Sequence, residues 1–497
     1  MSNAEPVETN STTRHSFEYT RWLFLRLLGL IYLISFASLG VQILGLIGDH
    51  GVSPAANFLY KVSMQLGAEG YLVVPTIAWI NSSDLALQLI CWAGALMSLL
   101  AIAGIFTAPA LFLCYVLYVS LVNIGQDFLT FQWDFLLLEV GFVAIFLSPW
   151  EIFEKPLARG KTVEAPLAII WLLRLIIFKL MFMSGMAKIA SGDQTWSQLT
   201  ALNYHYETQP LPTPLAWVAA KLPELFQKFS VLAMFFIELL APFFIFTTRK
   251  LRAIAAGLIV FLQLLIAGTG NYAFFNLLAI ALCIPLLDDS FLNSVSPRRL
   301  RGIFDHPRVA LKARKYFHIA VACLLIPLTL GQLLGPVIPP LRLLNIITEP
   351  FGISNGYGLF AVMTTERDEI IIEGSNDRLT WLQYEFPFKP GDIRRPPPIV
   401  APYQPRLDWQ MWFASLGTYE GNPWFGRLML RLLQGAPDVL KLLSKNPFPD
   451  APPKYVRATF YQYHFTNFDT LTKTGQWWRS EYRSEYFPTA TVEGPAT

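Results

Sequence analysis

Apolar runs of helical length fill the first two thirds of the chain. A bilayer core is about 30 Å thick, so a helix needs about 20 apolar residues to cross it, and fewer where neighbouring helices shelter it. We therefore predict transmembrane helices at 22–47, 85–106, 109–122, 133–148, 166–188, 229–247, 252–269, 272–287 and 317–335. The third and fourth are short, and one of them could re-enter the membrane instead of crossing it. Together these stretches define a membrane domain at 22–335, after a polar N-terminal segment at 1–21.

From about residue 340 the pattern changes to the alternation that is typical of half-exposed strands. The predicted strands are Ile370–Ile372, Trp381–Phe388, Tyr455–Phe465 and Trp477–Tyr486. Leu407–Leu416 and Pro423–Lys445 have apolar residues at helical spacing, and the proline-rich Arg395–Pro405 is an extended connector. Packing of these helices on the strands is favoured over binding to the membrane surface, because the second helix has few cations to hold anionic lipid. The predicted fold class is a polytopic α-helical membrane domain of about nine transmembrane helices, followed by a β-rich α+β domain at 340–497.

The orientation follows from lysine and arginine in the short connections, which gather on the cytoplasmic side of membrane proteins. If the N-terminus is cytoplasmic, that side carries Arg14, Arg21, Lys155, Arg159, Lys161, Arg249, Lys250 and seven cations from Arg298 to Lys315. The loops on the opposite side hold only Lys61, Lys221 and Lys228. The nine-span prediction is therefore N-in/C-out, with an extracytoplasmic C-terminal domain. A miscount of one span would reverse the position of that domain.

The composition agrees with a membrane protein. The chain is 54% apolar and 15% charged, and its mean hydropathy is +0.42, whereas about a quarter of the residues in soluble domains are charged. A net charge of +3 does not suggest a nucleic-acid partner. The four cysteines lie in apolar runs and form no CxxC motif, so we expect no metal site. The chain also lacks a P-loop and an HExxH.

Candidate chemistry begins with ionisable residues inside the predicted spans, since each costs a few kcal/mol near the bilayer centre unless it has a partner, a cavity or a function. The predicted membrane polar network consists of Asp134, Glu139, Arg174, Lys179 and Glu238. Two interpretations stay open: structural pairs that set helix register, or a functional polar cavity.

Lys188 and the loop that follows it form a second candidate. Lys188 ends the fifth span, where its ammonium could reach the membrane surface or, if partly desolvated, act as a base. In the 189–228 loop, His205 lies between two tyrosines and is followed by Glu207. This arrangement is consistent with the entrance to a catalytic or binding site, and it is also consistent with an ordinary aromatic belt at the membrane interface.

Several unusual strings resemble the lipase maturation factor family. They are Trp133–Phe142, Gly192–Pro214, Asn355–Ile370, Phe388–Pro397, Arg406–Leu416, Pro423–Leu433 and Lys445–Pro449, and the match extends from the first span to about residue 470. Animal members of the family are endoplasmic reticulum membrane proteins needed for secreted lipases to become active, and their C-terminal region contacts the client in the lumen.

The resemblance implies a folding factor rather than an enzyme. Its partners would be membrane lipid and a secreted client protein such as a lipase, and it would need no cofactor. The implied client-binding residues are Tyr357, Arg367, Arg406, Asp408, Trp409 and Trp412.

Two features depart from the animal pattern. The predicted outward segments contain no cysteine, which excludes disulfide exchange by the chain's own thiols, and they contain one glycosylation sequon, Asn81-Ser82-Ser83. Both favour a bacterial member in the inner membrane; a eukaryotic member would be in the endoplasmic reticulum membrane.

A fainter resemblance supplies an alternative function. The string Met183–Asp193 is similar to the region around the catalytic lysine of the vitamin K-dependent gamma-glutamyl carboxylase family. It implies a membrane enzyme in which Lys188 acts as the base on a lipophilic, quinone-like cofactor or substrate, assisted by His205 or Glu207.

Overall fold

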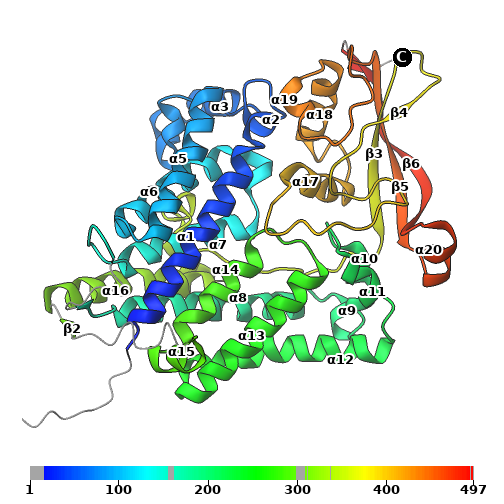
Figure 1. The fold of residues 1–497 in the computed structure, drawn as a ribbon. Coiled ribbons are helices and arrows are strands. Elements are labelled where there is room, and N and C mark those ends of the chain that lie inside the picture. The colour runs from blue at the N-terminus through cyan, green and yellow to red at the C-terminus, as the bar shows by residue number, and fades with distance from the viewer. Residues whose placement is uncertain are drawn as a thin grey trace, which may run out of the picture.

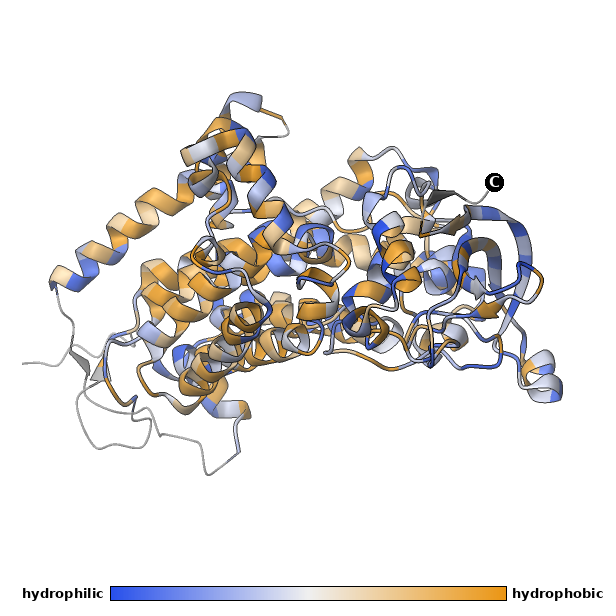
Figure 2. Ribbon diagram, turned by 90° about the horizontal axis from the view of Figure 1, so that it is seen from above, coloured by the Kyte–Doolittle hydropathy of each residue, from blue (hydrophilic) through white to orange (hydrophobic). Residues whose placement is uncertain are grey.

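The protein consists of a helical bundle and a sheet-containing domain that packs against one end of it (Figure 1). The structure is a computed structural model, and it describes residues 16–154, 162–297, 308–309, 312–335, 337–492 and 494–495. Several cations used above for the orientation lie outside these residues: Arg14, Lys155, Arg159, Lys161, Arg298, Arg299 and Arg301. In Figure 2 the bundle is mainly hydrophobic, and the C-terminal domain is mixed in hydropathy.

Sixteen α-helices precede the C-terminal domain in the described residues. They are α1 (Glu18–Gly40), α2 (Ile43–Ile47), α3 (Ala55–Leu66), α4 (Gly70–Val73), α5 (Asp84–Ala103), α6 (Thr107–Ile124), α7 (Gln132–Leu147), α8 (Leu167–Ala190), α9 (Gln194–Ser197), α10 (Leu202–Thr208), α11 (Pro214–Ala219), α12 (Glu224–Phe235), α13 (Arg249–Thr269), α14 (Phe275–Cys283), α15 (Asp289–Val295) and α16 (Lys312–Leu334). A π-helical turn at Phe236–Leu240 and a 3₁₀ helix at Ala241–Phe246 extend α12. A two-stranded parallel sheet joins β1 (Thr162–Val163) to β2 (Arg308–Val309).

Each of the nine predicted spans coincides with a helix, but the count of nine is not confirmed. Among the described residues, seven helices are long and apolar enough to cross a membrane. Phe275–Leu286 and Asp289–Val295, which meet at a bend of 115°, would make an eighth if they form one span. Helix α7 has 16 residues and is about 24 Å long, which is short of the bilayer core. The polytopic class is therefore confirmed, whereas the orientation, which depends on an odd number of crossings, stays a prediction.

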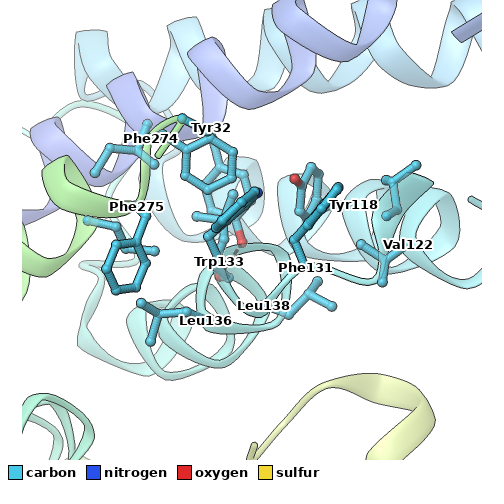
Figure 3. Close-up of a cluster of buried hydrophobic side chains, with 14 of the residues drawn as sticks. Tyr32, Tyr118, Val122, Phe131, Trp133, Leu136, Leu138, Phe274 and Phe275 are labelled. Atoms are coloured by element: carbon cyan, nitrogen blue, oxygen red, sulfur yellow. Dashed lines mark hydrogen bonds between the residues drawn. The ribbon is translucent and has the colours of Figure 1, made fainter. Parts of the chain in front are cut away.

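The core of the bundle lies between α1, α5, α6 and α7. Figure 3 shows Tyr32 of α1, Tyr118 of α6 and Trp133 of α7 in this buried cluster. The rings of Tyr32 and Tyr118 meet edge to face, with centroids 6.0 Å apart. A Cβ added to Gly141 of α7 would lie 1.8 Å from the Tyr32 hydroxyl oxygen. The close packing of α1 against α7 thus requires glycine at this position.

The C-terminal domain is built on an antiparallel sheet with the strand order β4-β3-β5-β6-β7. Its elements are β3 (Arg367–Ser375), β4 (Leu382–Gln383), α17 (Arg406–Ser415), α18 (Pro423–Leu433), α19 (Pro437–Leu440), β5 (Tyr455–Phe465), α20 (Phe468–Thr474), β6 (Trp478–Thr491) and β7 (Gly494–Pro495). The four predicted strands are confirmed, although the second is reduced to two residues.

The amphipathic helices of this domain pack on the sheet, as favoured above. Ile370 and Ile372 of β3 are fully buried with Phe425 and Leu428 of α18 in one core. The predicted helix at Pro423–Lys445 is interrupted: Gly435 has a positive φ of 63°, which ends α18 with the left-handed residue typical of a helix C-terminus. Pro437 then starts α19. The fold class, a polytopic helical membrane domain followed by an α+β domain, is confirmed.

Candidate functional site

A seam of buried polar clusters lies where the two domains meet. The cluster whose ion pair crosses from one domain to the other we call the Asp134 cluster (Asp134, Arg406 and Tyr118). Arg406, the first residue of α17, forms two hydrogen bonds of 2.9 Å with the two carboxylate oxygens of Asp134 in the first turn of α7. The Tyr118 hydroxyl donates to the same carboxylate at 2.5 Å. Both charged side chains are at most 1% exposed. The carboxylate of the bundle is therefore neutralised by a cation from the C-terminal domain.

The second set, the Glu139 cluster, consists of Glu139, Lys179, Tyr357 and Asn355. Lys179 of α8 lies 2.5 Å from the Glu139 carboxylate of α7. The Tyr357 hydroxyl donates to Glu139 at 2.5 Å, and the Asn355 backbone N–H donates at 3.3 Å. Two membrane helices and the segment that enters the C-terminal domain thus converge on one carboxylate.

The third set, the Lys188 cluster, consists of Lys188, Glu238 and Trp196, all of which belong to the bundle. Lys188 lies 2.9 Å from one carboxylate oxygen of Glu238 and 3.1 Å from the other. It also donates to the Ser184 carbonyl at 3.3 Å and lies 5.4 Å from the centre of the Trp196 ring. Glu238 lies in the π-helical turn that extends α12. The ammonium is 4% exposed, so it does not extend to the lipid surface, which corrects that interpretation. The Lys188 nitrogen is already bound by Glu238 and by the Ser184 carbonyl, so this geometry does not favour the catalytic role either.

Among the described residues, no hydrogen bond or ion pair joins His205 or Glu207 to Lys188. The half-buried His205 ring packs edge to face on Phe360, with centroids 5.0 Å apart. Burial, with a smaller contribution from positive Lys188, lowers the His205 pKa to about 4. Glu207 accepts from the Phe465 backbone N–H at 2.8 Å and lies 3.1 Å from the His464 ring nitrogen. Glu207 therefore connects α10 to the end of β5.

A fourth set, the Arg367 cluster (Arg367, Glu369 and Lys389), connects the sheet to the loop above the bundle. Arg367 of β3 lies 2.7 Å from Glu369, whose other carboxylate oxygen lies 2.8 Å from Lys389. Arg367 also donates to the backbone carbonyls of Glu207, at 2.7 Å, and Pro210, at 3.0 Å. Arg367 thereby provides hydrogen-bond donors for the backbone carbonyls of the turn that follows α10.

The implied client-binding residues lie mainly in this seam, which corrects the expectation of an exposed surface. Arg406, Asp408, Trp409, Tyr357 and Arg367 are between 1% and 4% exposed. Trp412 is half-buried and donates from its indole nitrogen to the Thr208 carbonyl at 2.8 Å. Because these side chains are buried against their own chain, they do not present a surface to a client. All of them except Asp408 contact the bundle or its loops.

Asp408 of α17 binds a turn of the C-terminal domain and not the bundle. Its carboxylate accepts the backbone N–H groups of Phe388 and Lys389, both at 2.8 Å. Burial raises the Asp408 pKa to about 6, although these hydrogen bonds and nearby Lys389 act in the opposite direction. Asp408 therefore fixes the 388–389 turn above the helix.

The predicted membrane polar network is paired except at one position. Asp134, Glu139, Lys179 and Glu238 each lie in an ion pair. Arg174 instead donates to the Pro285 carbonyl at 2.8 Å and lies over the rings of Trp171 and Phe17. Structural pairing is the better interpretation, but two pairs depend on the C-terminal domain or its entry segment.

Sequence reasoning missed Tyr118 and Lys389 as members of the seam. Tyr118 lies in an apolar span, where a tyrosine gives no local sign of a polar role. Lys389 lies in the Phe388–Pro397 string, but nothing in that string shows that the lysine is 3% exposed and paired with Glu369.

Two family models match this chain, one over the helical bundle and one over the C-terminal domain. Residues 19–294 match the lipase maturation factor transmembrane domain, and residues 353–488 match the lipase maturation factor C-terminal domain. The chain belongs to the lipase maturation factor family. The seam described above lies between the two domains that define this family.

Vertebrate lipase maturation factors are similar over nearly the whole chain. Lipase maturation factor 2 of Gallus gallus is 34% identical, over 96% of this chain and 82% of its own length. Lipase maturation factor 1 of Mus musculus is 34% identical over 96% and 88%, and lipase maturation factor 2 of Homo sapiens is 34% identical over 96% and 83%. No solved structure matches the chain. These relatives give no support to a bacterial origin or to the carboxylase alternative, and the quinone-like cofactor stays a prediction.

Proposed function

We propose that this protein is a membrane-anchored maturation factor, which holds its C-terminal domain against the bundle so that this domain can engage secreted client proteins such as lipases. The supporting observation is the match to relatives named lipase maturation factors, at 34% identity over 96% of the chain. The buried seam adds a physical reason. Arg406 of the C-terminal domain neutralises Asp134 of the bundle, with both side chains at most 1% exposed, and Arg367 donates to backbone carbonyls of the turn after α10. Buried contacts of this kind require a fixed docking of the two domains.

The proposed orientation is N-in/C-out, so that the C-terminal domain meets clients after they have left the cytoplasm. The cation distribution along the chain supports it. The membrane would be the bacterial inner membrane or the endoplasmic reticulum membrane, according to the organism.

A maturation assay tests the proposal directly. A secreted lipase is expressed in cells that lack their own maturation factor, with or without this protein, and active enzyme per secreted lipase molecule is measured. We expect the protein to raise this ratio. Equal ratios with and without the protein, at verified membrane abundance, would contradict the proposal.

Two variants in the same assay separate docking from chemistry at Lys188. Arg406→Ala leaves Asp134 without its cation and should lower the ratio of active lipase. Lys188→Met, which breaks the pair with Glu238, should lower it only as far as it lowers the amount of folded protein. Complete loss of activity in Lys188→Met at normal abundance and stability would instead favour chemistry at the Lys188 cluster.

A further inference from the structure

The outer edge of β6 is unpaired over most of its length. One side of β6 pairs with β5, and on the other side, within the residues that the structure describes, only Ala490 and Thr491 pair with a strand, β7. The N–H groups of Trp477 and Trp478 donate to the Ile393 carbonyl at 2.9 and 3.1 Å, so the free edge begins after Trp478. Figure 1 shows β6 on the side of the sheet away from the helical bundle. Such an edge presents backbone donors and acceptors that can bind an added strand.

This edge has exposed side chains of both charges, and a β-bulge after Tyr482 places Arg479 and Glu481 on one face of the sheet and Glu485 on the other. Arg479, Glu481, Arg483 and Glu485 are all exposed, and Arg483 lies 3.8 Å from Glu366. Charges on an edge oppose unselective pairing with other sheets. Arg479 and Glu481, which share one face before the bulge, also favour an added strand with charges of the opposite sign facing them, because directly opposed charges of unlike sign stabilise strand pairing.

A cleft of about 440 Å³ lies beside this edge, between the sheet and the segment 383–395. Its sheet side includes Tyr461 and Tyr463 of β5 and Ser480 of β6. Ser480 pairs with Tyr463 and Tyr482 pairs with Tyr461 across the two strands, so the cleft reaches the edge itself. The Tyr482 ring is 60% exposed, and its centroid lies 5.6 Å from that of Tyr461. A volume of this size accepts a large side chain.

The charged groups that line the cleft are already bound within the chain. Lys389 lies 2.8 Å from Glu369, and Glu385 lies 2.9 Å from Lys445. Asp392 accepts the Arg394 backbone N–H at 2.9 Å, and Arg395 donates to the Phe386 carbonyl at 2.7 Å. Lys389 and Glu385 are therefore held in ion pairs, and Asp392 and Arg395 are held by backbone groups. Tyrosine rings and polar backbone remain, which complement a peptide with apolar side chains and a polar main chain.

We propose that the β6 edge and this cleft together bind an extended segment of a secreted polypeptide. The segment adds as a strand beyond β6 and places one aromatic side chain in the cleft. Backbone hydrogen bonds provide affinity with little demand on sequence, while the cleft and the charges select among segments. A client that is not fully folded still has unpaired strands of this kind. The inference rests on the proposed function, because it names the surface through which the client is held.

The ladder register identifies the backbone donors that a client strand would use. The Trp478 N–H donates away from β5, to the Ile393 carbonyl at 3.1 Å, which marks Trp478 and Phe465 as a non-hydrogen-bonded pair. Hydrogen-bonded and non-hydrogen-bonded pairs alternate along an antiparallel ladder, and Tyr482 opposite Tyr461 is then a non-hydrogen-bonded pair. The Tyr482 N–H therefore points outward. Tyr482→Pro removes this donor at a position where an edge strand tolerates proline, and Tyr482→Thr removes the same ring but keeps the donor.

The test uses the full chain in lipid nanodiscs and a fluorescent peptide of about ten residues, a typical strand length. The peptide has arginine and glutamate in alternation, valine between them and a central tyrosine. Wild-type protein should bind it, Tyr482→Thr should bind within about threefold of wild type, and Tyr482→Pro should bind at least about tenfold more weakly than Tyr482→Thr. A peptide N-methylated at every second amide should not bind wild type. Replacing its tyrosine with alanine should weaken binding about tenfold.

Several outcomes would overturn the inference. Equal binding by Tyr482→Pro and Tyr482→Thr, or unchanged binding of the N-methylated peptide, would show that no strand is added at β6. This second measurement uses wild-type protein, so it decides the matter even if Tyr482→Pro folds poorly. Self-association of the wild type in nanodiscs that Tyr482→Pro abolishes, without peptide binding, would assign the edge to a second copy of the chain.

The maturation assay separates this inference from the proposed function. If Tyr482→Pro lowers the fraction of active lipase and Tyr482→Thr does not, both are supported. If Tyr482→Pro matures lipase normally while Arg406→Ala fails, the edge is not the client site and the proposed function stands. If the wild type has no effect on the lipase, the proposed function fails, and client binding at the edge fails with it.

Discussion

At the residue scale, the buried charges between the domains come in compensated sets. Asp134 has Arg406 and Tyr118, and Glu139 has Lys179 and Tyr357. A buried ion pair adds little net stability, because removing two charges from water offsets their attraction, but an unpaired buried charge is strongly destabilising. These sets therefore specify the docked arrangement more than they strengthen it.

The Asp134 cluster gives the sharpest stability prediction. Arg406→Ala leaves the Asp134 carboxylate buried without its cation, and we expect a loss of about 3–5 kcal/mol in the free energy of unfolding. The double variant Arg406→Met with Asp134→Leu should lose less than either Arg406→Ala or Asp134→Leu alone. Chemical unfolding of the purified protein in detergent measures each value. Strictly additive effects of the single changes would show that the two side chains are not coupled.

Two residues outside the spans predict opposite pH dependences. Asp408 has its pKa raised from 3.8 to about 6, so between these values the folded state binds more protons than the unfolded state, and stability falls as pH rises. His205 has its pKa lowered from 6.5 to about 4, so in that window the unfolded state binds more protons, and stability rises with pH. The difference in unfolding free energy, wild type minus variant, should fall with pH for Asp408→Asn and rise for His205→Gln.

Thermal or chemical unfolding from pH 4 to pH 7 would measure both difference curves. For Asp408 the full change corresponds to about 3 kcal/mol. Slopes of the same sign for the two variants would contradict the assigned pKa directions.

At the element scale, close backbone approach joins the bundle to the C-terminal domain at a second place. A Cβ added to Gly45 of α2 would lie 2.4 Å from the Asp438 carbonyl oxygen of α19 and 2.8 Å from the Leu442 side chain. The nearest atom belongs to the backbone of α19, and a backbone atom cannot move away by a change of rotamer as a flexible side chain can. Docking of α19 therefore depends on glycine in α2.

We predict that Gly45→Ala displaces α19 and costs about 1–3 kcal/mol. Hydrogen exchange at 437–443 should become faster, because local opening of α19 needs less free energy. Gly426→Ala in α18 is the control, since a Cβ there meets nothing within 4 Å and should stabilise the helix by about 0.5–1 kcal/mol. Unchanged exchange in Gly45→Ala would mean that the two helices can separate without strain.

At the scale of the whole molecule, the bundle and the C-terminal domain form a docked body whose free sheet edge faces away from the helices (Figure 1). This arrangement places most of the proposed client site on the side of the sheet away from the bundle, while Trp217 of α11 packs on Trp477, the residue just before β6. It also makes the orientation in the membrane decisive, since the site meets secreted proteins only if the C-terminal domain is outside the cytoplasm.

Cysteine labelling tests the orientation. Lys473 of α20 and Lys250 of α13 are both exposed and lie on the two sides expected from N-in/C-out. In a Cys323→Ala background, which removes the exposed native thiol, a membrane-impermeant maleimide should label Lys473→Cys in sealed right-side-out vesicles. It should label Lys250→Cys only after the membrane is opened. The reverse pattern would place the C-terminal domain in the cytoplasm.

The sequence by itself determined the elements and the class. Hydrophobic runs located every long helix, because a bilayer demands about 20 apolar residues wherever a helix crosses. The alternation of polar and apolar residues located β3, β5 and β6. The seven sequence strings described above indicated the family. Each of these signals depends only on residues that are close together in the sequence, so it can be recognised without the tertiary structure. The interruption after α18 was missed, although Gly435 and Pro437 were visible, because the apolar spacing continued across them.

Only the tertiary structure decided what the polar residues do. Arg406 and Asp134 are 272 positions apart, and no local pattern indicates that one neutralises the other. Residues expected to face a client, such as Trp409 and Arg367, are buried between domains, and Lys188 is bound to Glu238. The physical reason is that the role of a charge depends on its burial and partner, which arise when distant segments pack. Strands β5 and β6 also show the same alternation of polar and apolar residues in the sequence. Only the structure shows that β5 is paired on both sides and that β6 has a free edge.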